Sequence, residues 1–88
     1  MSRYRTAHDV LRAEIDGQEV LLNTKTGEYH LVNSTGRAIL VSLEEGQTLQ
    51  DSAAEVAAEA GEDLGRVADE ANVFVHAMCE RGLLEEIE

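Results

Sequence analysis

The sequence lacks several features that mark familiar classes of protein. It contains a single cysteine, Cys79, so an internal disulfide is excluded and a reduced, cytoplasmic setting is expected. Residues 1–12 hold no apolar stretch of the signal-peptide type, and no later run is long enough to span a bilayer. Tryptophan is absent, and tyrosine and phenylalanine together supply only three residues. The core is therefore predicted to be mainly aliphatic.

The residue patterns of catalytic and metal sites are also missing. The three histidines, His8, His30 and His76, do not form a ligand set, and His76 with Cys79 one helical turn away supplies only two ligands. The sequence shows no Ser-His-Asp or Cys-His grouping and no glycine-rich phosphate loop. Cys79 has no obvious activating base, so a buried thiol is expected. We therefore expect a protein that is not an enzyme and that uses no metal and no cofactor.

Basic side chains are scarce in the second half of the chain. Residues 1–43 carry five basic and five acidic side chains, whereas residues 44–88 carry two basic and thirteen acidic ones, which accounts for the whole net charge of -11. Nucleic-acid binding and anionic membranes both favour the opposite sign, so neither partner is expected. A basic peptide or protein is the natural complement, although an acidic surface can also serve solubility alone.

The first half of the sequence predicts a three-stranded antiparallel meander. Residues 10–15 form the first predicted strand, and Asp16-Gly17 is a strong hairpin signal because both residues tolerate a positive φ. Residues 19–23 form the second predicted strand. A short turn over residues 24–27 then leads to the third strand, residues 28–32.

After residue 33 the period becomes helical. Three amphipathic helices are predicted over residues 34–45, 48–61 and 63–81, with N-caps from Asn33 or Ser34, from Thr48 and from Asp63. The apolar stripe of the third helix is Leu64, Val67, Ala71, Phe74, Val75 and Met78.

The order of three strands followed by three helices predicts an α+β fold of the winged-helix type. We expect one domain over residues 10–88, preceded by a flexible segment over residues 1–9. The leucines of the tail, Leu83 and Leu84, are expected to fold back against the core. The protein is predicted to be a monomer or a weak dimer.

Several short motifs, taken in order, resemble the PqqD-like leader-recognition proteins, and the resemblance covers roughly residues 10–88. The motifs are Asp16-Gly17, Val20-Leu21-Leu22-Asn23, Gly27-Glu28-Tyr29, Val32-Asn33-Ser34-Thr35-Gly36, Gly46, Thr48 and, after Phe74, Arg81-Gly82-Leu83-Leu84.

This resemblance implies a small domain that binds the leader of a ribosomally synthesised precursor peptide and presents it to a leader protease or other modifying enzyme. A protein of this length looks most like the stand-alone leader-binding proteins of lasso-peptide clusters. The alternatives are a PqqD-type peptide chaperone for a radical SAM enzyme and, from architecture alone, a winged-helix DNA-binding regulator.

The third strand is the predicted docking site, because a final strand in a meander lies at a sheet edge unless something covers it. Its residues are Glu28, Tyr29, His30, Leu31 and Val32. Tyr29 and Leu31 share one face and could belong either to the core or to a groove, while His30 and Val32 share the other face. Val32 is expected to be a core residue whose backbone belongs to the edge.

The third helix is predicted to supply the other wall of a peptide groove. A second stripe emerges on this helix at Asp69, Val73, His76, Ala77 and Glu80. Val73 and Ala77 are apolar residues on that stripe, although scattered exposed apolar residues are common. Asp69, with Glu70 and Glu80, could receive a basic side chain of the peptide or could simply be solvated.

Overall fold

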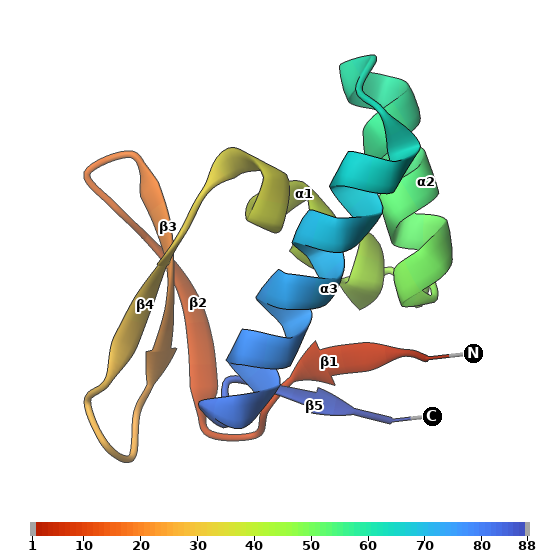
Figure 1. The fold of residues 1–88 in the computed structure, drawn as a ribbon. Coiled ribbons are helices and arrows are strands. Elements are labelled where there is room, and N and C mark those ends of the chain that lie inside the picture. The colour runs from red at the N-terminus through yellow and green to blue at the C-terminus, as the bar shows by residue number, and fades with distance from the viewer. Residues whose placement is uncertain (1, 88) are drawn as a thin grey trace.

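The computed structural model describes residues 2–87, and its central feature is the predicted meander (Figure 1). Strands β2 (Val10–Ile15), β3 (Gln18–Asn23) and β4 (Tyr29–Val32) pair antiparallel in the order β2-β3-β4. Asp16 and Gly17 have φ values of 53° and 79° and make the two-residue turn between β2 and β3, as their sequence predicts.

The two faces of this sheet have different surroundings. Val10, Leu21 and Val32 are buried in the core beneath the helices, so they define the inner face. Side chains of the alternate positions point the other way. We call these residues the outer sheet face: Leu11, Ala13, Ile15, Gln18, Val20, Leu22, Tyr29 and Leu31.

The three predicted helices follow the meander, each with a predicted capping residue. They are α1 (Ser34–Glu44), α2 (Leu49–Ala60) and α3 (Leu64–Glu80). The side chains of Asn33, Thr48 and Asp63 accept hydrogen bonds from the amides three residues on, at 2.8, 3.1 and 3.0 Å. These caps satisfy amides that a helix N-terminus leaves unpaired, and they confirm the predicted helix starts. The α+β fold, a meander followed by three helices, is thereby confirmed.

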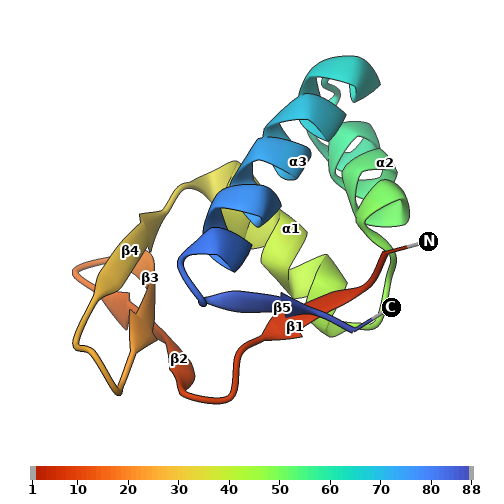
Figure 2. The same cartoon turned by 60° about the horizontal axis from the view of Figure 1, so that its bottom comes forward.

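A second, two-stranded sheet joins the two ends of the chain and corrects the expected flexible segment. Strand β1 (Tyr4–Thr6) pairs antiparallel with β5 (Leu84–Glu86), and the Leu49 amide donates to the Ser2 carbonyl at 2.9 Å (Figure 2). Residues 4–6 are therefore part of the domain, because β5 supplies their backbone partners. Met1 and Glu88 lie outside the described residues.

The core lies between the inner sheet face and the helices, and it is aliphatic as predicted. Leu83 and Leu84 are buried, which confirms that the tail folds back. Leu64 was expected in the core stripe of α3, but its side chain is 53% exposed. It lies in the first turn of α3, beyond the reach of the sheet. Among residues 2–87, no helix is long and apolar enough to cross a membrane.

A polar contact ties the sheet to α1. Arg12 on the inner face of β2 binds Glu19 of β3 at 2.7 Å and also pairs with Glu44 at the end of α1. Burial lowers the pKa of Arg12, but the hydrogen bonds and charges of Glu19 and Glu44 outweigh it, so the net shift is upward. The guanidinium therefore stays charged where α1 meets the sheet.

Candidate peptide-binding site

Strand β4 has one free edge, as the sequence predicts for the last strand of the meander. Within residues 2–87, β4 pairs only with β3. The Asn23 amide donates to the Glu28 carbonyl at 2.8 Å, so the hydrogen-bonded positions of this antiparallel ladder continue at His30 and Val32. The N–H and C=O groups of Tyr29 and Leu31 consequently point away from β3, toward the open edge. An extended peptide could pair with these four groups.

A groove of about 420 Å³ runs between this edge and α3. Its lining comes from three elements: the end of β4, the first turns of α1, and the middle of α3. The lining residues are His30, Leu31, Asn33, Thr35, Gly36, Ile39, Asp69, Glu70, Ala71, Val73 and Phe74. Val73 is 70% exposed in the groove wall, and Leu31 is 53% exposed at its edge. An apolar side chain of a bound peptide would remove both from water.

Gly36 brings α1 close to both β4 and α3 at one end of the groove. A Cβ atom at this position would lie 2.9 Å from Cγ1 of Val32 and 3.2 Å from Cε1 of Phe74, which is closer than carbon atoms pack. A side chain here would therefore force Val32 or Phe74 to shift. The glycine allows the half-buried Phe74 ring to lie against the start of α1 and to form part of the groove.

The charges of the groove are unevenly distributed. Asp69 and Glu70 are exposed on the α3 side, and the Glu70 carboxylate lies 3.8 Å from the Arg66 guanidinium, which also pairs with Glu62. On the β4 side, partial burial lowers the pKa of His30, and the positive charge of Arg81 lowers it further. The imidazole is accordingly neutral at pH 7, so the groove combines a neutral histidine with two carboxylates.

The structure brings together four of the nine predicted site residues: His30, Leu31, Asp69 and Val73 line the groove. The other five lie elsewhere. Tyr29 is on the outer sheet face, Val32 is buried in the core as expected, and Glu28 is exposed in the turn before β4. His76 and Ala77 line a different hollow, beside β1 and β5.

That second hollow also contains Cys79 and Glu86. Burial raises the pKa of the Cys79 thiol, and the nearby Glu86 carboxylate raises it further. The thiol is therefore protonated at neutral pH. His76 lies 3.5 Å from Glu80 on the same helix, and both side chains are well exposed.

The contribution of α1 to the groove is the part that sequence reasoning missed. Asn33, Thr35 and Gly36 were interpreted only as the start of a helix, and Phe74 only as a core residue. A glycine within the first turn of a helix is a signal of close approach, because it has a poor helix propensity and needs another reason to be there. It does not reveal which element approaches.

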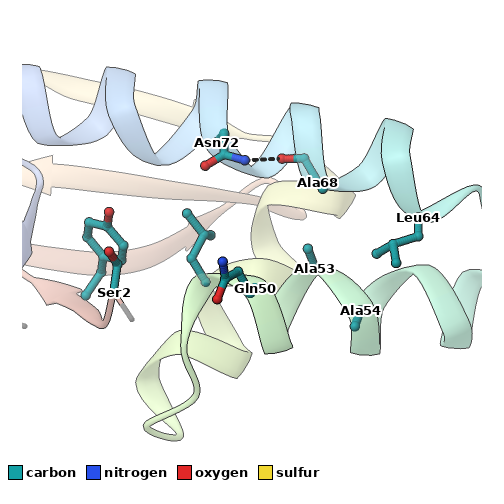
Figure 3. A pocket seen from close by; sticks show the side chains of 9 residues that line it. Ser2, Gln50, Ala53, Ala54, Leu64, Ala68 and Asn72 are labelled. Carbon is teal, nitrogen blue, oxygen red and sulfur yellow. Dashed lines mark hydrogen bonds between the residues drawn. The ribbon is translucent and has the colours of Figure 1, made fainter.

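A separate pocket of about 450 Å³ lies between α2 and α3 (Figure 3). Its lining residues are all uncharged: Ser2, Tyr4, Leu49, Gln50, Ala53, Ala54, Leu64, Ala68 and Asn72. The Asn72 side chain donates to the Ala68 carbonyl of its own helix at 2.8 Å, and Leu64 points toward α2.

Comparison with known proteins identifies the family of this chain. Residues 18–84 match the family model described as coenzyme PQQ synthesis protein D, PqqD. The chain belongs to the PqqD family. The match includes β4, α1 and α3, which are the elements that form the groove. No curated protein matches this PqqD-family chain.

Two solved structures resemble this PqqD-family protein over nearly their whole length. TbiB1 in complex with the TbiA(beta) leader peptide has a TM-score of 0.80 and 31% sequence identity, covering 92% of this chain and 94% of TbiB1. A lasso peptide synthetase B1 complexed with the leader peptide has a TM-score of 0.85 and 24% identity, covering 94% of this chain and 98% of its own, and it shares the fold. These findings confirm the resemblance to PqqD-like leader-recognition proteins.

Proposed function

We propose that this protein binds the leader segment of a ribosomally synthesised precursor peptide, as a strand added to β4, and delivers it to a leader protease or other modifying enzyme of the lasso-peptide type. The observation that carries the proposal is the open edge at Tyr29 and Leu31 beside an apolar groove. The similarity to TbiB1, whose structure contains a leader peptide, supports it.

The free energies are of the right size for such a complex. Four backbone hydrogen bonds at the edge contribute about 1 kcal/mol each. Two apolar side chains buried in the groove contribute about 2 kcal/mol each. Ordering a flexible peptide opposes this gain. We therefore expect one-to-one binding with a Kd below about 10 μM, which corresponds to roughly 7 kcal/mol.

A protein that binds a leader in this groove could also deliver it to a different kind of enzyme. The family match to PqqD favours, as a second candidate, a peptide chaperone that serves a radical SAM enzyme. Both functions use leader binding on β4, and they differ in the enzyme that receives the peptide. The acidic charge of residues 44–88 argues against the winged-helix DNA-binding alternative.

Two variants of Leu31 test strand addition directly. Leu31→Pro removes an N–H that points to the open edge and leaves the β3–β4 ladder intact, and proline is tolerated at such edge positions. Leu31→Ala keeps the N–H and removes most of the side chain. Calorimetric titration should use synthetic leaders of short precursor peptides sought among the genes that neighbour the gene for this protein, with circular dichroism to check folding.

Strand addition predicts that Leu31→Pro weakens leader binding clearly more than Leu31→Ala does. Equal affinities of two folded variants would show that this edge N–H is not used. No binding of the leader by the wild-type protein would contradict the proposed function as a whole, whichever enzyme receives the peptide.

A further inference from the structure

None of the eight strand residues of the outer sheet face is charged, and the one charged residue that lines the hollow on this face is Asp16 of the turn between β2 and β3. An antiparallel sheet that packs a core on one side and meets water on the other normally alternates apolar with polar residues. Here seven of the eight outward positions are apolar or aromatic, and Gln18 is the exception. All three helices lie on the opposite side of the sheet (Figure 1), so no helix covers this face, and Val20 at its centre is buried at 1% exposure.

The exposed apolar area of the molecule is concentrated on this face. Of the eight large hydrophobic side chains that are exposed within residues 2–87, four belong to it: Leu11, Ile15, Tyr29 and Leu31. Each is more than half exposed, which gives about 400 Å² of apolar surface if a fully exposed side chain offers roughly 150–200 Å². A patch of this size on a small monomer is commonly an interaction site.

The charge of the molecule argues against a second copy of the chain as the occupant. Each copy carries a net charge of -11, so two copies repel at long range.

The outer sheet face is continuous with the β4 edge that is proposed to bind the leader. Tyr29 and Leu31 present their backbone groups to the edge and their side chains to the outer sheet face. A strand docked on β4 would place alternate side chains beside them and widen the face to four strands.

We propose that the outer sheet face, widened by the docked leader, is the docking surface for the enzyme that processes the peptide. This inference rests on the proposed function. The partner surface that fits is apolar and uncharged. Because the leader supplies part of the contact, the enzyme binds the leader-loaded protein more tightly than the free protein, and by linkage it tightens leader binding by the same factor.

The test separates docking of the enzyme from binding of the leader. Leu11 and Ile15 lie on β2, which β3 separates from the β4 edge. The double variant Leu11→Lys/Ile15→Lys therefore adds two charges to the face without touching the leader site. The matched control is Val41→Lys/Leu64→Lys, which charges two exposed apolar positions on the helices. The probes are the synthetic leader and a purified peptide-processing enzyme sought among the same neighbouring genes, measured by surface plasmon resonance.

We expect the β2 double variant to bind leader within twofold of the wild type, and to bind the enzyme at least tenfold more weakly. The control variant should match the wild type in both assays. Leader should strengthen enzyme binding in the wild type and the control, whose outer sheet face is intact, and not in the β2 double variant. A β2 variant that binds leader and enzyme normally overturns the docking surface. Sedimentation that shows a wild-type dimer, lost in this variant, would instead identify a second copy as the occupant. Wild-type protein that fails to bind leader contradicts the proposed function and not this face alone.

Discussion

The replacement of Val73 by glutamate tests whether α3 forms one wall of the peptide groove. The Val73 side chain is 70% exposed, so a bound peptide can remove roughly 80 Å² of its apolar surface from water, worth about 2 kcal/mol. A glutamate would lose that contact and would place a carboxylate under the peptide, beside Asp69 and Glu70. The expected loss is about 2–3 kcal/mol, or roughly 30- to 150-fold in Kd.

The same substitution should barely affect folding. Exposed positions usually change the free energy of unfolding by about 0.5 kcal/mol or less, which corresponds to a shift in Tm of a few degrees for a domain of this size. Leu64→Glu is the matched control, because Leu64 is also exposed on α3 but lies in the pocket between α2 and α3. It should leave leader affinity unchanged.

Isothermal titration and thermal melting on the same samples distinguish the possible roles of Val73. Wild-type affinity and a normal melting curve for Val73→Glu would remove α3 from the site. A large fall in Tm, with normal affinity of the folded fraction, would show that Val73 is a packing residue instead.

Two further predictions concern the groove. Gly36→Ala should lower the free energy of unfolding by about 1 kcal/mol, since crowding against Val32 and Phe74 costs roughly 1–3 kcal/mol and better helix propensity returns up to about 1. Urea unfolding measures this change. Gly65→Ala is the control: its Cβ atom would meet only the capping oxygen of Asp63, at 3.2 Å, so it should destabilise less than Gly36→Ala. His30 should make leader binding pH-dependent. Burial lowers the pKa of His30 in the folded protein, so folding stability holds above pH 6.5 and falls as the pH drops below it. A leader that covers the groove buries the imidazole further and lowers this pKa again, so leader affinity should fall in the same direction. Titrations from pH 7.5 to 5.0 should show this decline, and an equally steep decline in His30→Gln would refute it.

Local signals in the sequence were sufficient to predict most of the fold. Asp16-Gly17 predicted the first turn, and the capping residues Asn33, Thr48 and Asp63 predicted all three helix starts, because turns and caps depend on groups within a few residues of each other. The edge position of β4 followed from its place as the last strand of the meander.

The pairing of β1 with β5 was not predictable in the same way. Each strand has three residues, too few to show an alternating pattern, and the two are 78 or more residues apart in sequence. Their pairing depends on α3 returning the chain to its starting end, which is a property of the packed molecule.

In the candidate site, too, some features could be predicted from the sequence and others depend on tertiary packing. By itself the sequence placed His30, Leu31, Asp69 and Val73 on the right elements, because strand and helix periods assign faces. It could not show that α1 completes the groove through Gly36, nor that His76 and Ala77 lie around the helix in another hollow. Helical periodicity predicts which residues share a face, but only the packing of α3 against α1, α2 and β5 decides what each face contacts.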